Sequence, residues 1–191
     1  LYIWSDLEGS TLEEAKLKLS QLDNRFDNLK KIQNVFLHCY FNSKDTDLLF
    51  NKLTSNEKTD FSRYNYFYAR HLDNKGQKIE ARKIIKKALK KYPRNLILNQ
   101  YEVNLELQKN FSDFNCSNKV EIVAELLYIA ANALSSQSYF QTSNFYLNFS
   151  KYLNKNFYSF DTLLAENFYN IEDLKSAKKM YQKLRKNGNA F

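Results

Sequence analysis

A 34-residue internal repeat limits the possible folds of this chain more than any other sequence feature. The segment 127–134 aligns with the segment 161–168, and small and bulky residues then recur at the same offset. The matched pairs are Ala131 with Ala165, Leu134 with Phe168, Ser143 with Ala177, and Leu147 with Tyr181. Small residues let two helices approach closely, and bulky ones fill the groove between them. A period of this length predicts a row of helix pairs, each stacked on the next.

A more complete unit of the same kind lies upstream, in residues 63–93. Ala69 and Ala81 are small residues that allow its two helices to pack closely. Gly76 supplies the turn that ends the first helix, and Pro93 ends the second. Only 3 Gly and 1 Pro occur in the 191 residues, too few for the turns of many short strands. The composition therefore favours an all-helical chain.

This upstream unit resembles the tetratricopeptide repeat. Gly76, Ala81, Ala88 and Pro93 occupy the signature glycine, the two second-helix alanines and the closing proline of that family. The later units depart from the signature, since serine, lysine or leucine replaces several of these residues. The resemblance implies an all-α fold, a right-handed superhelix of antiparallel helix pairs. We expect residues 1–191 to form a single array of this kind, taken from a longer chain.

The array is predicted to be interrupted at about residues 94–119. Residues 96–107 read as a helix, but 109–118 contain polar turn-forming residues where a second helix is expected. Weaker units precede the well-matched one, with Ala15 and Leu19 in the first and Phe36 in the second. The chain contains no run of about 18 apolar residues, so the sequence predicts no membrane span.

The net charge of +8 has two explanations. Most cations are Lys, and the chain is also rich in Asn, Ile, Phe and Tyr, as expected from a low-GC genome. The most basic segment, 75–94, has apolar residues at helical spacing, which predicts an amphipathic helix with a solvated lysine face. Binding of phosphate is the less favoured alternative. The dense aromatic residues, including Phe140, Phe145 and Phe149, are predicted to be core.

The sequence offers no candidate for catalysis, metal binding or a cofactor. His38 and His71 lack a carboxylate or nucleophile at the spacing that orients a catalytic pair. Cys39 and Cys116 have no second cysteine or histidine at metal-ligand spacing around them. They are interpreted as buried thiols. The sequence leaves open whether they form a disulfide, which needs an oxidising compartment. We expect a protein that is not an enzyme.

The resemblance places the functional surface on the concave face, which first helices of successive units line. The residues projected onto it are Arg63, Tyr66, Arg70, Tyr128, Asn132, Ser135, Glu166 and Tyr169. Tyrosine and arginine are common in protein interfaces. The expected function is a scaffold that binds a peptide or protein partner, without nucleic acid.

The last third of the chain is similar to a group of tetratricopeptide-repeat proteins of alphaproteobacteria, as in Ala124–Tyr128, Phe145–Leu147 and Asp161–Glu166. Many of those proteins look exported, so the resemblance implies a location in the bacterial cell envelope or periplasm. A cytoplasmic location stays an alternative. Two alternatives follow for the function. One is an accessory helical region of a larger envelope enzyme or assembly, and the other, less favoured, is a nucleic-acid-binding repeat.

Overall fold

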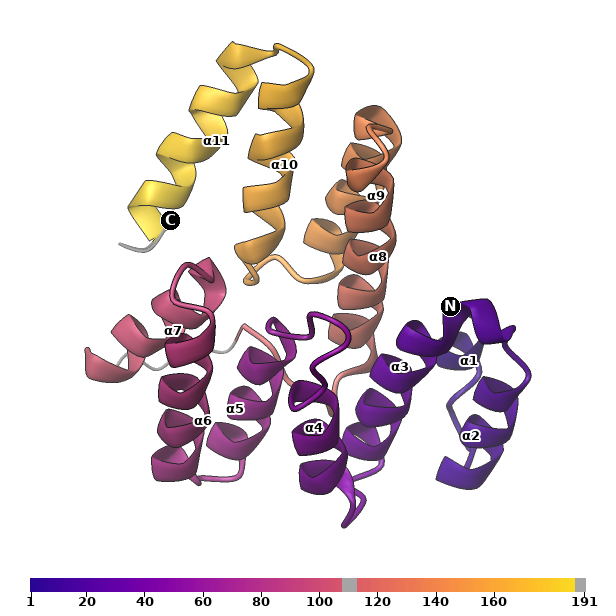
Figure 1. The fold of residues 1–191 in the computed structure, drawn as a ribbon. Coiled ribbons are helices and arrows are strands. Elements are labelled where there is room, and N and C mark those ends of the chain that lie inside the picture. The colour runs from indigo at the N-terminus through magenta and orange to yellow at the C-terminus, as the bar shows by residue number, and fades with distance from the viewer. Residues whose placement is uncertain (108–112, 188–191) are drawn as a thin grey trace. The chain divides into compact units, whose positions relative to one another are not determined.

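The computed structural model describes residues 1–107 and 113–187, and within these ranges all regular secondary structure is helical (Figure 1). The predicted all-α class is confirmed for this part of the chain. Its residues form two compact units, one of residues 1–95 with 115–119, the other of residues 96–114 with 120–191. The division falls within the segment that the sequence marks as an interruption. A single continuous array over the whole chain stays a prediction.

The first unit contains six α-helices and a short 3₁₀ helix. They are α1 (Tyr2–Ser5), α2 (Leu12–Ser20), η1 (Asn24–Phe26), α3 (Asp27–Tyr40), α4 (Thr46–Thr54), α5 (Tyr64–Asn74) and α6 (Lys78–Lys91). From α2 onward, each α-helix packs on the next in chain order, up to α5 with α6. Aromatic rings pack against one another in the core of this unit, where the ring of Phe36 meets those of Phe50 and Phe67 edge-on.

The second unit contains the remaining α-helices. They are α7 (Leu96–Glu106), α8 (Lys119–Ser136), α9 (Phe140–Leu153), α10 (Ser159–Asn170) and α11 (Leu174–Asn187). α10 packs on α9 and on α11. The helix predicted over 96–107 is confirmed as α7. Of the loop predicted over 109–118, residues 113–118 contain no regular helix, and the rest lies outside the described residues.

Four turns, each between the two helices of a pair, share one backbone geometry. Asn42, Gly76, Ser138 and Glu172 each follow a helix and adopt a left-handed backbone, with φ of 50°, 77°, 63° and 61°. In each turn the next residue donates its N–H to a carbonyl five residues back, as Gln77 does to Leu72 at 2.9 Å and Asp173 to Phe168 at 2.9 Å. This is the bonding pattern of a Schellman cap. Residues 42 and 76 are 34 apart, as are 138 and 172, so the predicted period is present in the backbone.

The small residues of the repeat are buried where the sequence predicts helix contacts. Ala69, Ala81, Ala131, Ser143, Ala165 and Ala177 are all buried. The earlier, weaker units agree, since Ala15, Leu19 and Phe36 are also buried. On α6 the apolar Ala81, Ile85 and Ala88 face inward, whereas the cations of segment 75–94 are exposed. The amphipathic helix predicted there is confirmed.

Candidate functional site

The three site residues predicted in the first unit differ from the expected exposed position. Tyr66 and Arg70 on α5 are buried, with exposed fractions of 2% and 3%. The Tyr66 ring meets Phe67 edge-on, and Arg70 forms an ion pair with Asp73 at 2.8 Å. Arg63 is half-buried, with its guanidinium 5.6 Å from the Phe67 ring centre. The sequence placed Tyr66 and Arg70 on the surface, but in this structure both side chains are interior.

The five site residues predicted in the second unit are better exposed. Asn132 on α8 and Glu166 and Tyr169 on α10 lie at the surface. Tyr128 and Ser135 on α8 are half-buried. The Tyr128 ring lies 5.6 Å from that of Phe160, at the start of α10. These residues lie on α8 and α10, the first helices of two successive pairs, and Ser135 on α8 donates a hydrogen bond to Asn167 on α10.

A buried amide holds these two helices in register. Asn167 on α10 accepts a hydrogen bond from the Ser135 hydroxyl at 2.6 Å and donates to Ser143 and Asn144 on α9, both at 2.8 Å. Ser143 in turn donates to the carbonyl of Ala131 on α8 at 2.8 Å. Since Asn167 and Ser143 are fully buried, all three helices are fixed by polar contacts that water does not weaken.

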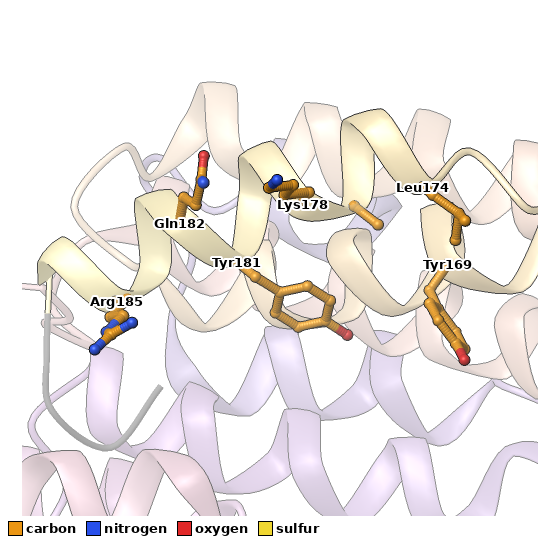
Figure 2. Close-up of a pocket in the computed structure, with 7 residues that line it drawn as sticks. Tyr169, Leu174, Lys178, Tyr181, Gln182 and Arg185 are labelled. Atoms are coloured by element: carbon orange, nitrogen blue, oxygen red, sulfur yellow. The ribbon is translucent and has the colours of Figure 1, made fainter.

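A hollow of about 460 Å³ lies beside these residues, between α10 and α11. Its lining residues are Tyr169, Leu174, Ala177, Lys178, Tyr181, Gln182 and Arg185. Tyr169 and Tyr181 are 61% and 45% exposed, and Figure 2 shows their rings and Arg185 projecting in the same direction. The sequence predicted Tyr181 as a packing residue, from its alignment with Leu147. Leu147 is buried, whereas Tyr181 is open to solvent in the described structure.

The surface around the hollow carries both signs of charge. Partial desolvation raises the pKa of Glu166 above its ordinary value. Burial also raises the pKa of Tyr181, and the neighbouring Glu166 and Tyr169 add to this increase. Lys178 and Arg185 provide cations on α11. The site can therefore accept an apolar side chain next to a charged or hydrogen-bonding group.

A second exposed aromatic surface lies on α9 and was missed by the sequence analysis. Phe145, Phe149 and Tyr152 are 58%, 49% and 73% exposed, and the two phenylalanine rings are 5.0 Å apart. Their spacing of i, i+4 and i+7 places them on one face of the helix. Core positions were predicted for Phe145 and Phe149, and that prediction is wrong. The i, i+4, i+7 pattern was visible in the sequence, but a single helix does not reveal which face is covered.

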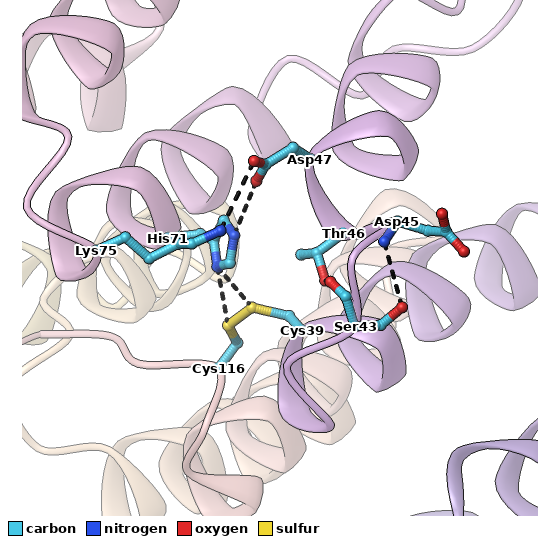
Figure 3. A network of polar contacts seen from close by, with 8 residues as sticks. All are labelled: Cys39, Ser43, Asp45, Thr46, Asp47, His71, Lys75 and Cys116. Carbon is cyan, nitrogen blue, oxygen red and sulfur yellow. Dashed lines mark hydrogen bonds and ion pairs between the residues drawn. A yellow bond between two sulfur atoms is a disulfide. The ribbon is translucent and has the colours of Figure 1, made fainter.

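The first unit contains a polar cluster that the sequence did not predict (Figure 3). Cys39, at the end of α3, and Cys116, in the segment 115–119, are joined by a disulfide with a Cα–Cα distance of 5.8 Å. The sequence predicted that both cysteines are buried, which is confirmed, and left their pairing open; the structure shows that they are paired. His71 on α5 places Nδ1 3.0 Å from the Cys39 sulfur and 3.9 Å from that of Cys116. Its Nε2 lies 2.9 Å from Asp47 on α4.

The carboxylate partner of His71 was missed because it is 24 residues away, on another helix. Burial lowers the pKa of His71, against the opposing effect of Asp47, so the neutral imidazole is favoured at pH 7. Lys75 lies 3.7 Å from the other oxygen of Asp47. A neutral His71 that donates from Nε2–H to Asp47 directs the lone pair of Nδ1 toward the two sulfurs.

Comparison with protein-family models, curated proteins and solved structures finds no match for this chain. The relation to tetratricopeptide repeats therefore stays a resemblance, based on the sequence signature of one unit. In the described parts of the chain, no helix combines the length and the apolar character that crossing a bilayer requires.

Proposed function

We propose that this protein is a tetratricopeptide-like scaffold, without catalytic activity, that binds a segment of a protein partner on the surface of α8, α10 and α11. The observation that carries the proposal is the hollow between α10 and α11, where Tyr169 and Tyr181 are exposed beside Arg185. Tyrosine and arginine contribute most often to the energy of protein interfaces. Rigid aromatic rings offer a partner a large contact area at little cost in conformational entropy.

The chemistry of the hollow indicates the kind of segment that it binds. An apolar side chain fits between the two tyrosines and Leu174, all of which expose apolar surface. A carboxylate on the same segment can pair with Arg185 or Lys178, and Arg185 can do so through two parallel hydrogen bonds. We therefore propose a peptide segment that carries an apolar residue near an acidic one.

The repeat geometry supports the tetratricopeptide-like architecture of this proposal. Left-handed caps recur 34 residues apart, at Asn42 and Gly76 and at Ser138 and Glu172. First helices in such stacks line one face, and α8 and α10 contribute the exposed Asn132 and Glu166. Stacked helix pairs bury their apolar faces against their neighbours and leave an extended surface for a partner.

Site-directed photo-crosslinking tests the proposal. A photoreactive phenylalanine derivative replaces Tyr169 in the protein expressed in its own cells, and in separate variants it replaces Tyr152 on α9 and Tyr2 on α1, which are both exposed. We expect a discrete crosslinked protein at position 169 and none at position 2. Crosslinking confined to position 152 would assign the partner to the aromatic face of α9 and contradict the proposal.

A second experiment measures the affinity of tyrosine variants for the partner segment that the crosslink identifies. Replacing both Tyr169 and Tyr181 by Ala should weaken binding at least about tenfold, since each interfacial tyrosine of this kind contributes more than about 1 kcal/mol. The Tyr152→Ala variant is the matched control and should bind like the wild type. Equal affinity for the double variant, measured by fluorescence anisotropy, would remove the hollow as the binding site.

The exposed cations of segment 75–94 favour nucleic acid as a second candidate. Lys78, Lys86, Lys87 and Lys90 are exposed on α6, and Lys83 forms an ion pair with Glu80 at 2.7 Å. Binding through this face would weaken steeply between about 50 and 200 mM salt. Absence of salt-dependent binding to single- or double-stranded DNA and RNA would exclude this candidate.

The disulfide supports the proposed compartment. Disulfides persist in oxidising compartments such as the bacterial periplasm and are rare in the cytosol. The Cys39–Cys116 bond thus agrees with the cell-envelope location that the resemblance implies. A role as an accessory region of a larger envelope assembly remains compatible with the same binding surface.

A further inference from the structure

We propose that the reduced form of this protein binds one zinc ion through Cys39, Cys116 and Nδ1 of His71, with Asp47 orienting the imidazole. The disulfide and the zinc ion are then alternative occupants of one site in the first unit. The inference rests on the Cys39–His71–Cys116 cluster alone and is independent of the proposed partner surface.

The geometry brings three ligand atoms together in the interior. The two sulfurs and a ring nitrogen of His71 all lie within 4.8 Å of one another. The exposed fractions of Cys39, Cys116 and His71 are 3%, 4% and 7%. Thiolate sulfur and imidazole nitrogen are the ligands that zinc prefers in proteins. Three protein ligands leave a fourth position of the tetrahedron for a water molecule.

The orientation of His71 is that of a metal ligand. Nε2 is 2.9 Å from the Asp47 carboxylate, so it carries the hydrogen, and Nδ1 presents its lone pair to the sulfurs at 3.0 and 3.9 Å. A disulfide has no hydrogen to donate to that buried lone pair. A metal ion between the three atoms would satisfy it, and metal-bound histidines in proteins almost always donate their other N–H to a carboxylate or carbonyl in this way.

Charge balance selects a divalent ion. Two thiolates and a neutral imidazole carry a charge of −2, which Zn²⁺ neutralises completely. A monovalent ion such as Cu⁺ would leave a net negative charge in a buried site, and burying unpaired charge is costly. Asp47 adds a further negative charge, but its side chain is 43% exposed and has Lys75 nearby.

Conversion of the disulfide form to the zinc form begins with a balanced two-electron reduction. A dithiol supplies two electrons and two protons: the S–S bond of the protein breaks, two thiols form, and the dithiol becomes a cyclic disulfide. Zn²⁺ then replaces the two thiol protons, which pass to solvent. Zinc binding to the reduced protein should therefore release about two protons per ion.

The test compares oxidised and reduced protein. The full chain is reduced with dithiothreitol, freed of it by anaerobic gel filtration, and titrated with Zn²⁺ against a chromophoric chelator. We expect one Zn²⁺ per reduced chain and no comparable binding to the oxidised chain. Co²⁺ in place of Zn²⁺ should give a thiolate-to-cobalt charge-transfer absorption and the visible spectrum of a tetrahedral ion.

Matched variants separate the cluster from the rest of the unit. His71→Gln and Cys116→Ser should each lose high-affinity zinc binding, whereas His38→Gln should retain it, because His38 is also buried but hydrogen-bonds Ser43 instead. Asp47→Asn should weaken zinc affinity by about 10- to 100-fold, the usual effect of removing a partner of a ligating histidine. Asp45→Asn, on the same helix end, should leave the affinity unchanged.

Three results would overturn the proposal. They are zinc binding that is equal in oxidised and reduced protein, absence of cobalt–thiolate absorption in the reduced chain, and unchanged zinc affinity in a folded His71→Gln variant. Far-UV circular dichroism reports whether each variant folds. If His71→Gln does not fold, the comparison of Asp47→Asn with Asp45→Asn decides whether the imidazole takes part.

Discussion

At the scale of residues, the two units use the same polar contact at the same repeat positions. His71 bonds Asp47, and Asn167 bonds Ser143, with a separation of 24 residues in each case. Each pair links the first helix of one hairpin to the second helix of the hairpin before it. A polar side chain at this position thus links successive hairpins. In the first unit that side chain is His71, which also faces two cysteines.

The Asn167 network should contribute strongly to stability. Asn167→Ala removes three hydrogen bonds from a fully buried site and leaves Ser135, Ser143 and Asn144 without this partner. We expect the free energy of unfolding to fall by about 2–4 kcal/mol, from unpaired polar groups and the small cavity. Urea denaturation followed by circular dichroism measures the change.

The control for that substitution lies on the same helix. Asn170→Ala changes an exposed residue at the end of α10 and should alter the free energy of unfolding by less than about 0.5 kcal/mol. If the two variants had the same stability, the buried network would not hold α8, α9 and α10 together.

Single residues of the candidate sites were only partly predictable. The exposed position of Tyr169 and Glu166 was predicted because the 34-residue register fixes which side of a first helix they occupy. Tyr66 and Arg70 follow the same register but are buried, and no local pattern distinguishes the two cases. The cluster at His71 depends on contacts across 24, 32 and 45 residues, which spacing along one helix does not reveal.

At the scale of elements, the caps show how the repeat is maintained where the signature glycine is absent. Ser138 and Glu172 take the left-handed backbone that Gly76 adopts without steric cost. The hydrogen bonds of the cap are nevertheless present in all three turns. The sequence predicted the turn positions, because the offset is constant, but the signature alone gave no reason to expect the same backbone at Ser and Glu.

Glycine at the two non-glycine caps should stabilise the protein. Ser138→Gly and Glu172→Gly each relieve a left-handed conformation that costs other residues about 1–2 kcal/mol, partly offset by the greater freedom of glycine when unfolded. We expect a net gain of about 0.5–1 kcal/mol for each. Gly76→Ala should lose about 1 kcal/mol from backbone strain alone, since a Cβ atom there would meet nothing within 4 Å.

Ser136→Gly provides the matched comparison for Ser138→Gly. Ser136 is the last residue of α8, where glycine lowers helix stability by up to about 1 kcal/mol. The two substitutions, two residues apart, should therefore shift the urea midpoint in opposite directions. A loss of stability in both would show that the Ser138 backbone is not strained in solution.

At the scale of the whole molecule, the chain divides into two compact units near residue 95 and returns to the first unit at 115–119. The sequence located the interruption by its turn-forming residues. It did not reveal that the segment after the interruption is tied back to α3, because that depends on one bond between residues 77 apart. The bond between Cys39 and Cys116 therefore closes a long covalent loop of the chain.

Closing a loop of this length should contribute substantially to stability. The Cys39–Cys116 bond restricts the unfolded chain over a separation of 77 residues, which the chain-entropy relation equates to about 4.5 kcal/mol. Reduction by dithiothreitol in the presence of a metal chelator should lower the urea midpoint of the wild type accordingly. The Cys39→Ala/Cys116→Ala variant should match the reduced wild type and show no response to dithiothreitol. A reduced wild type that unfolds at the same urea concentration as the oxidised one would mean that the bond does not stabilise the folded chain.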